Sequence, residues 1–376
     1  MTDPSAPLRD LVTLGLDIPW PDPDAERAAR DHRLERAPGR PVTPWGSLAA
    51  TAEWLAGVQG VFPPRPPADP RVVVVTSRHL SHADGRTLDD HLTAATALLD
   101  GTSALQQLAS GHGVRVEVVD GGEVGDIAVE DAGLTTSVVD GVDHGATLTD
   151  SMIDDGADLL VLTAVSAGGS TTAATLIAVL TTTEPALVAG RGTGLDDAGW
   201  AVKTAAIRDA RRRGQDARHD TDALLGAVGG RDIAILAGMV LQAANRRVPV
   251  LLDGISAVAA ALVARDVSPR ITRWMRLGHA GTDAGERIAV QRSGMVPLLD
   301  LELSGVGVTA GVGGLVAAQL VDTAARIADA PLSYAVPLPP QPEPEPEPVP
   351  ELEPQPAPEP EPETEPDDPD ESSADV

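Results

Sequence analysis

The stretch LLVLTAVSAGGSTTAATLIAVL, residues 159–180, decides the fold of this chain. It opens with branched aliphatic residues, passes through small residues that include two adjacent glycines, and continues with a helical composition. It carries no charge up to Thr183, which raises the question of a membrane span. Its many serines and threonines argue against a span, and the pattern predicts a buried strand, a turn, and a helix that Ser170 or Thr171 caps.

The turn in this stretch is a candidate anion site. A strand that runs through Gly168 and Gly169 into a helix presents free backbone N–H groups and the positive end of a helix dipole. Small residues at such a turn also serve close packing alone. The turn by itself therefore leaves a phosphate site and a packing turn both open.

A second turn, AGRGTGLDDAGWAVK, covers residues 189–203 and carries three glycines after a predicted strand. The spacing G-x-G-x-G is not that of the dinucleotide fingerprint. The backbone can still approach a phosphate closely there, and Lys203 lies two helical turns further on, where its ammonium could pair with that phosphate. A phosphate site and a purely structural turn again remain open.

A third unit of this kind, VPVLLDGISAVAAALVA, covers residues 248–264 and places Asp253 and Gly254 directly after a predicted strand. In open α/β sheets the ligand binds outside the carboxyl ends of the strands. We therefore expect the three turns to face one cleft.

The rest of the chain alternates β-branched runs with alanine-rich segments, which is typical of a parallel sheet covered by helices. The predicted strands are residues 72–76, 114–119, 159–163, 186–188 and 248–252. The predicted helices are residues 24–36, 46–60, 88–99, 171–181, 197–212, 231–247 and 255–264. We expect a helical N-terminal arm over 1–60, an α/β domain of Rossmann-like three-layer type over 61–335, and a disordered tail over 336–376.

The tail is compositionally distinct. Residues 337–376 hold 15 of the 33 prolines and 14 acids without a basic residue, which favours an extended polyproline II chain. It is interpreted as a solubilising extension or as a docking strand for a proline-reading or basic partner. The rest of the chain is also acidic and has few aromatic residues, which argues against a nucleic-acid partner.

Several site classes are excluded or disfavoured. The chain has no cysteine, which removes disulfides, zinc–thiolate sites and thiol nucleophiles. His79, His82 and Asp84 have the spacing of metal ligands, but with no second cluster nearby we interpret them as a solvated polar loop and expect no metal. No nucleophile elbow and no Gly-Lys-Ser/Thr phosphate loop occurs. The start of the chain lacks a secretion signal, so we expect a cytoplasmic protein with no membrane partner.

Four segments together resemble the nicotinate-nucleotide:dimethylbenzimidazole phosphoribosyltransferase family of cobalamin biosynthesis. They are PWGSLAATAEWLAGVQG, GRGTGLDDAGWAVKTAAIRDA, GGRDIAILAGMVLQAANRRVPVLLDG and GHAGTDAGERIAVQRSGMVPLLDL, in the order that the family has them. The resemblance extends over about residues 24–330 and implies the α/β fold of that family.

The resemblance implies transfer of phosphoribose from nicotinate mononucleotide to 5,6-dimethylbenzimidazole or a similar base, giving α-ribazole phosphate and nicotinate. It implies no cofactor and a homodimer. The residues that it assigns to substrate binding lie in the three turns and the helix after the second: Ser166, Gly168, Gly169, Ser170, Gly190, Gly192, Thr193, Gly194, Lys203 and Asp253. The reaction also needs a carboxylate that takes the ring proton of the attacking base.

Departures from the family concern its acidic positions. Ala164 stands where the family has an acid, and Gly307 stands where its catalytic glutamate is expected. Asp283 and Glu286 stand where the family usually has glutamate and histidine. Glu302, five residues before Gly307, is the candidate for a substitute base, provided that it ends a strand.

Three functional hypotheses follow. The first is an active base phosphoribosyltransferase with a substitute base or an altered acceptor slot. The second is a catalytically impaired paralogue that binds a nucleotide or a benzimidazole as a regulator or carrier. The third is an unrelated sugar-phosphate enzyme on the same scaffold. Because loss of a general base costs about a hundred- to ten-thousand-fold in rate, a slow enzyme, a different acceptor and no catalysis are all compatible with the sequence.

Overall fold

The structure, a computed structural model, describes residues 8–36, 45–81, 83–85, 87–192, 194–303 and 310–330. The chain divides into two compact units, Met1–Leu332 and Ser333–Val376. The second unit, which contains the predicted tail, lies outside the described residues.

A parallel sheet forms the centre of the first unit. Its strands are β1 (Pro70–His79), β2 (Arg115–Val124), β3 (Leu159–Ala167), β4 (Val250–Leu252), β5 (Met275–His279) and β6 (Pro297–Leu299). Their order across the sheet is β2-β1-β3-β4-β5-β6. The order of addition therefore reverses between β1 and β3, and ligands bind at the carboxyl ends of strands beside such a reversal.

β1 and β3 lie in the middle of the sheet and are covered on both faces. Val72 to Val75 and Leu159 to Val161 have no exposed surface. A strand that is buried on both faces needs no alternation of polar and apolar residues, which explains these unbroken aliphatic runs. Near the carboxyl ends, Ser77 of β1 pairs in register with Ser166 of β3.

Helices connect the strands. The described ones are α1 (Leu11–Gly15), α2 (Pro23–Arg36), α3 (Ser47–Gln59), α4 (Leu88–Leu99), α5 (Ala104–Gly111), α6 (Thr135–Asp154), α7 (Gly169–Leu180), α8 (Pro185–Val188), α9 (Asp197–Asp216), α10 (Thr221–Val228), α11 (Arg231–Asn245), α12 (Ile255–Val267), a 3₁₀ turn η1 (Pro269–Arg273), α13 (Ala284–Ser293) and α14 (Val312–Ile327).

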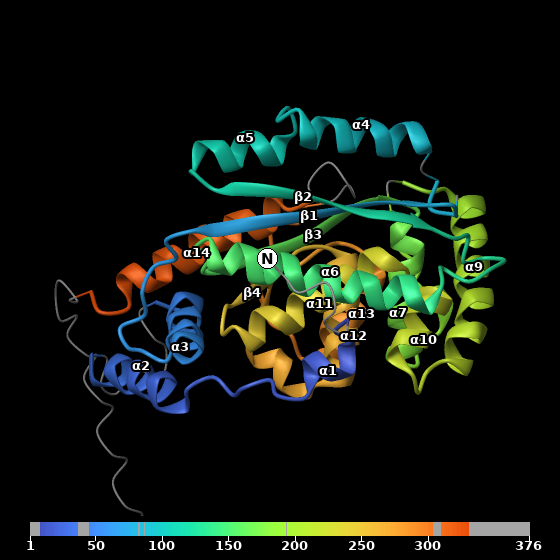
Figure 1. Ribbon diagram of the computed structural model, residues 1–376. Coiled ribbons are helices and arrows are strands. Elements are labelled where there is room, and N and C mark those ends of the chain that lie inside the picture. The colour runs from blue at the N-terminus through green and yellow to red at the C-terminus, as the bar shows by residue number, and fades with distance from the viewer. Residues whose placement is uncertain are drawn as a thin grey trace, which may run out of the picture. The chain divides into compact units, whose positions relative to one another are not determined.

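The helices make two layers around the sheet. α4, α5 and α14 contact one face, and α7, α11 and α12 contact the other. Figure 1 shows α4 and α5 above β1 and β2, with α6, α7, α11 and α12 on the opposite side. The expected three-layer α/β arrangement with a parallel sheet is therefore confirmed.

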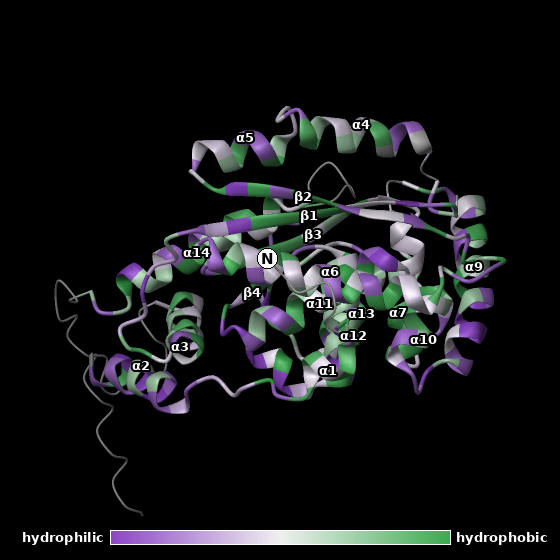
Figure 2. Ribbon diagram, in the orientation of Figure 1, coloured by the Kyte–Doolittle hydropathy of each residue, from purple (hydrophilic) through white to green (hydrophobic). Residues whose placement is uncertain are grey.

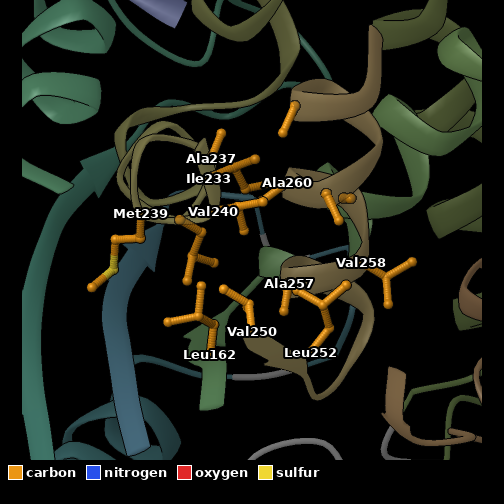
Figure 3. Packing of buried hydrophobic residues seen from close by; sticks show 14 of the residues in the cluster. Leu162, Ile233, Ala237, Met239, Val240, Val250, Leu252, Ala257, Val258 and Ala260 are labelled. Atoms are coloured by element: carbon orange, nitrogen blue, oxygen red, sulfur yellow. The ribbon is translucent and has the colours of Figure 1, made fainter. Parts of the chain in front are cut away.

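The core is a continuous cluster of aliphatic side chains. Leu162 of β3, together with Val250 and Leu252 of β4, packs against residues of α11 and α12, as Figure 3 shows. Figure 2 shows hydrophobic residues along β1 and β3 and mainly hydrophilic ones along α2. Burial of this apolar area is the main source of stability for a fold of this kind.

The N-terminal helices pack against the body of the first unit. α3 contacts α2 and α14, and α1 contacts α11 and α12. The indole N–H of Trp54 donates a hydrogen bond to the backbone oxygen of Arg273 at 2.9 Å, and that of Trp274 donates one to Pro19 at 2.7 Å. These bonds tie two buried indoles to segments far away in the sequence.

Most of the predicted elements are confirmed, and one is wrong. Residues 88–99 form a helix with the predicted bounds, but residues 186–188, predicted as a strand, belong to α8. Pro185 at the start of α8 has a backbone φ suited to the first helical turn, which favours the helix. Among the elements that were not predicted are α6, α14 and the short strands β5 and β6. In the part of the chain that the structure describes, no helix is long and apolar enough to cross a membrane.

Candidate active site

A cavity of about 230 Å³ opens beyond the carboxyl ends of β3, β4 and β5. Hydroxyl groups line part of it, from Thr163, Ser166, Ser170, Ser256 and Thr282. Ionisable side chains line another part, from Arg191, Asp253, His279, Asp283 and Glu286. The apolar part of the lining includes Ala164, Ile255, Leu303 and Ala310.

The three predicted turns meet at this cavity. Ser166 and Ser170 come from the first turn, Gly192 from the second and Asp253 from the third. For the first and third turns this convergence follows from the fold, because the parallel strands β3 and β4 end at the same edge of the sheet. The second turn follows the helix α8, not a strand, so the sheet alone does not explain its place.

The glycines of the second turn differ in what surrounds them. Gly192 has a φ of +53°, and a Cβ atom there would meet open space. A Cβ atom at Gly190 would overlap the carboxylate of Asp283. Gly192 therefore leaves the cavity open, whereas Gly190 makes room for a neighbouring acid. Gly194 has a positive φ but does not line the cavity, and Thr193 lies outside the described residues.

Lys203 lies behind the cavity wall. Its side chain is completely buried, and Nζ donates a hydrogen bond to Oγ of Ser170 at 2.9 Å. Burial lowers the pKa of the Lys203 ammonium, against the opposing effect of the Asp283 and Asp84 carboxylates. The lysine thus acts on the cavity through the Ser170 hydroxyl, not by lining the cavity itself.

The helix that follows the first turn, α7, begins without a side-chain cap. The N-cap of α7 is Gly168, with a φ of +79°, and not Ser170 or Thr171, so that expectation is wrong. The N–H of Gly168 donates a hydrogen bond to the Asp84 carboxylate at 2.6 Å. Gly169 is the first helical residue, and a Cβ atom there would press on Ser166. Close packing is thus one reason for small residues at this turn.

A buried polar network lies beside the cavity. The Ser166 hydroxyl is 2.6 Å from the Ser77 hydroxyl, which in turn donates to the Asp232 carboxylate at 2.6 Å. Nε2 of His79 lies 2.9 Å from the same carboxylate oxygen of Asp232, and Nδ1 of His79 lies 2.9 Å from the Thr172 hydroxyl. The network joins β1, β3, α7 and α11 below the cavity.

Asp232 is the charged centre of this network. Burial would raise the pKa of the Asp232 carboxyl, but the charge of His79 and the hydrogen bonds from His79 and Ser77 outweigh burial and hold the pKa below its usual range. The carboxylate is therefore ionised in the folded protein at neutral pH.

The interpretation of residues 79–84 as a solvated loop is wrong. His79 and Asp84 are both 3% exposed. Both make hydrogen bonds to residues that are distant in the sequence. His79 bonds to the Asp232 carboxylate, and the Asp84 carboxylate accepts the backbone N–H of Gly168. His82 lies outside the described residues, and the described residues contain no group of three or more acids and histidines suited to a metal ion.

Three residues with carboxyl groups line the cavity, Asp253, Asp283 and Glu286. Burial raises the pKa of both aspartates, opposed by hydrogen bonds to each and by the charges of His279 and Lys203. The pKa of Glu286 is raised to about 8, mainly by burial; the hydrogen bond from Gly281 opposes this rise and the charges of the neighbouring aspartates add to it. Such raised values are a feature of functional sites.

Glu302 is placed differently from these acids. It is exposed, has a φ of +52°, and does not line the cavity, although its neighbour Leu303 does. It follows β6 instead of ending it, since β6 stops at Leu299. Gly307 lies outside the described residues.

Sequence reasoning missed several residues of the lining, among them Arg191, His279 and Glu286. Arg191 stands inside the G-x-G-x-G turn, where a basic residue was a usable signal. His279 ends β5, a strand that was not predicted. Glu286 had been noted only as a departure from the family, because nothing local to it indicates burial.

Comparison with known proteins agrees with this geometry. Residues 18–334 match the family described as "Phosphoribosyltransferase". The nicotinate-nucleotide–dimethylbenzimidazole phosphoribosyltransferase of Mycobacterium avium is 38% identical over 303 residues, which span 75% of this chain and 86% of that protein. The protein of the same name from Mycobacterium ulcerans is 37% identical over 342 residues, which span 85% and 95%.

A solved structure has a similar fold. The crystal structure of CobT from Thermus thermophilus superposes with a TM-score of 0.73 at 27% sequence identity. The match covers 81% of this chain and 96% of that one. The similarity therefore extends over most of the chain.

Proposed function

Because the chain belongs to the nicotinate-nucleotide–dimethylbenzimidazole phosphoribosyltransferase family, we propose that it transfers phosphoribose from nicotinate mononucleotide to 5,6-dimethylbenzimidazole or a similar base. The products are nicotinate and α-ribazole phosphate, the precursor of the cobalamin lower ligand. The observation that carries the proposal is the meeting of three turns at one cavity, within the region that matches the family.

The phosphoribosyl group binds at the first and second turns. The Ser170 hydroxyl accepts a hydrogen bond from Lys203, which leaves its own proton free for a phosphate oxygen. Gly192 offers an approach for the phosphate along the backbone, and the Arg191 guanidinium at the cavity lining supplies a positive charge. Gly168, Gly169, Gly190 and Gly194 shape the two turns around this group.

The acceptor base lies against the apolar part of the cavity. Ala164, Leu303 and Ala310 provide a surface for a flat aromatic ring. Ala164 occupies the position where the family has an acid, which leaves more apolar surface here. Ser166 and Asp253 lie at the edge of this surface as hydrogen-bonding groups.

The chemistry is a substitution at C1′ of the ribose. The bond from C1′ to the nicotinate nitrogen breaks, and its electron pair returns to the pyridine ring. A nitrogen of the benzimidazole forms the new bond to C1′, and the other nitrogen loses its proton. Positive charge gathers on the sugar as the first bond breaks, and the Asp253 carboxylate at the cavity stabilises it.

The test is turnover of nicotinate mononucleotide with and without 5,6-dimethylbenzimidazole, followed by chromatography of nicotinate and mass spectrometry of α-ribazole phosphate. We expect nicotinate release that depends on the base. Ser170→Ala should raise the KM for the nucleotide, while Ser293→Ala, whose hydroxyl bonds the Val290 backbone away from the cavity, should not. Nucleotide binding without base-dependent release would refute the proposed transfer.

We further propose a cytoplasmic homodimer with these two small molecules as its ligands. The dimer rests on the resemblance to the family. A cytoplasmic location is supported by the substrate, because a phosphorylated nucleotide is charged and does not cross a bilayer unaided. Sedimentation of the purified chain and fractionation of cells test the two statements.

A further inference from the structure

The carboxyl groups at the cavity differ in the bonds that they already make. Oδ2 of Asp253 accepts the backbone N–H of Gly314 at 2.9 Å, at the start of α14. The N–H of Gly311 is a second donor to the Asp253 carboxylate. This carboxylate is therefore occupied in holding the first turn of α14.

Asp283 is occupied as well. It is the N-cap of α13, and its Oδ1 accepts the N–H of Gly285 at 2.8 Å. Its Oδ2 is buried without a hydrogen-bond partner among the described residues, on the side where Gly190 makes room for it. That oxygen is enclosed by protein atoms.

The carboxyl group of Glu286 has one oxygen that accepts no hydrogen bond from the described residues. It stands in the first turn of α13 and is 2% exposed, and that small surface faces the cavity. Oε1 accepts the N–H of Gly281 at 2.8 Å, and no donor in the described part of the chain bonds Oε2. One oxygen therefore fixes the side chain while the other remains available.

On the basis of the proposed function, we propose that Glu286 is the general base that accepts the ring proton of the attacking benzimidazole. As one ring nitrogen forms its bond to C1′, the N–H bond at the other nitrogen breaks and the proton passes to Oε2 of Glu286. The electron pair of that N–H bond stays in the imidazole ring and neutralises it. Nicotinate leaves with the electron pair of the old glycosidic bond, so charge and atoms balance.

The electrostatic environment of Glu286 supports this role. A general base works best when its pKa is near the working pH, and burial brings that of Glu286 to about 8. The charged groups that act on Glu286 are Asp253, Asp283 and Arg287. His279 and Lys203 act on those two aspartates in turn. The exposed Glu302 lacks this environment and serves as the matched control.

The experiment compares the full-length wild type with Glu286→Gln, Glu286→Asp and Glu302→Gln. Nicotinate release with 5,6-dimethylbenzimidazole is measured from pH 6 to about 9.5, with nucleotide binding by calorimetry and melting temperature as folding controls. We expect kcat of Glu286→Gln to fall about a hundred- to ten-thousand-fold with nucleotide binding retained, and Glu302→Gln to stay within about threefold of wild type. The rise of kcat/KM with pH should be present in the wild type and lost in Glu286→Gln.

Glu286→Asp keeps a titratable group and should retain a pH-dependent rate below that of wild type, which decides the matter if Glu286→Gln fails to fold. A Glu286→Gln enzyme with wild-type rate and pH profile would overturn the inference while leaving the proposed function intact. So would a Glu286→Asp enzyme whose profile is identical to that of wild type. If the wild type itself releases no nicotinate, the proposed function fails and the inference fails with it.

Discussion

The Nζ atom of Lys203 lies 2.9 Å from the Oγ atom of Ser170, with the lysine fully buried and the serine at the cavity. The ammonium of Lys203 thus orients the Ser170 hydroxyl from outside the cavity lining and does not itself contact a ligand in the cavity. Because a buried ammonium is strongly coupled to its few partners, the Ser170 hydroxyl is held in one orientation.

Lys203→Met should weaken binding of the nucleotide. The change removes the donor to Ser170 and the positive charge that faces Asp283, while keeping a side chain of similar length. A hydrogen bond to a charged group is worth about 1.5–3 kcal/mol, so we expect KM for nicotinate mononucleotide to rise about ten- to a hundredfold. Steady-state kinetics at saturating base measure it.

Arg208→Met on the same helix is the control for this substitution, because Arg208 is exposed and, among the described residues, pairs only with Asp209. Its KM should match that of the wild type. An unchanged KM in Lys203→Met would mean that Lys203 serves the fold alone.

Gly190→Ala should distort the cavity more than Gly192→Ala. A Cβ atom at Gly190 overlaps the Asp283 carboxylate, which must then move with the start of α13. At Gly192 a methyl group meets open space, and only the φ of +53° costs stability, about 1–2 kcal/mol.

Melting temperature and kcat/KM of the two alanine variants test this difference. We expect at least a tenfold lower kcat/KM for Gly190→Ala than for Gly192→Ala. Equal losses in the two variants would count against the packing of Asp283 on Gly190 as the cause.

Asp232→Ala should be strongly destabilising. The change leaves His79 and Ser77 without their shared acceptor in a region that water does not reach. Leaving a buried donor without its acceptor typically costs about 1–3 kcal/mol, and both neighbours lose their acceptor here. Asp140→Ala removes an acid that is more than half exposed and pairs with Arg231, and should cost less than about 1 kcal/mol.

Urea unfolding of both variants measures these costs. If the two costs are similar, the buried hydrogen bonds of Asp232 contribute no more to stability than the exposed pair of Asp140.

Glu286→Gln should stabilise the protein at alkaline pH. In the folded protein the pKa of Glu286 is raised from 4.5 to about 8, so the folded state holds a proton that the unfolded chain has lost between those values. The free energy of unfolding of the wild type therefore falls by up to about 5 kcal/mol as the pH rises from about 4.5 to 8. Above pH 8 this contribution no longer changes. Glutamine stays neutral and escapes this loss.

Melting temperatures of the wild type and Glu286→Gln at pH 5 and pH 9 measure the effect. The melting temperature of the variant minus that of the wild type should be larger at pH 9 than at pH 5, although the variant is the slower enzyme. Glu302→Gln is the control, because its side chain is exposed and should show no such gain. A pH-independent difference between Glu286→Gln and wild type would contradict the raised pKa.

Some elements of the fold are readable from local pattern and others are not. The helix over residues 88–99 has clear composition, and Thr87 and Asp90 form its capping box, so its bounds agree with the structure. β5 and β6 were missed because Met275–His279 and Pro297–Leu299 contain no β-branched residue, the signal by which the other strands were predicted. They become strands by pairing with each other and with β4.

The candidate site divides in the same way. Asp253 and Gly192 were predicted because each follows a strand or lies in a glycine turn at the edge where ligands bind. The pair formed by His79 and Asp232 was not predicted, since 153 residues separate the two in the chain. Glu286 looks like an ordinary acid in an exposed first helical turn until the packing around it is known.

The sequence by itself determined most of the succession of strands, glycine turns and helices, and with it the parallel sheet and the edge at which we propose that a phosphorylated ligand binds. These features depend on residues close together in the chain. Only the tertiary structure decided that Lys203 bonds Ser170, that the Asp283 carboxylate packs against Gly190, and that one oxygen of Glu286 has no donor among the described residues. The physical reason is that burial, and the change in pKa that it causes, depends on which distant segments exclude water from a side chain.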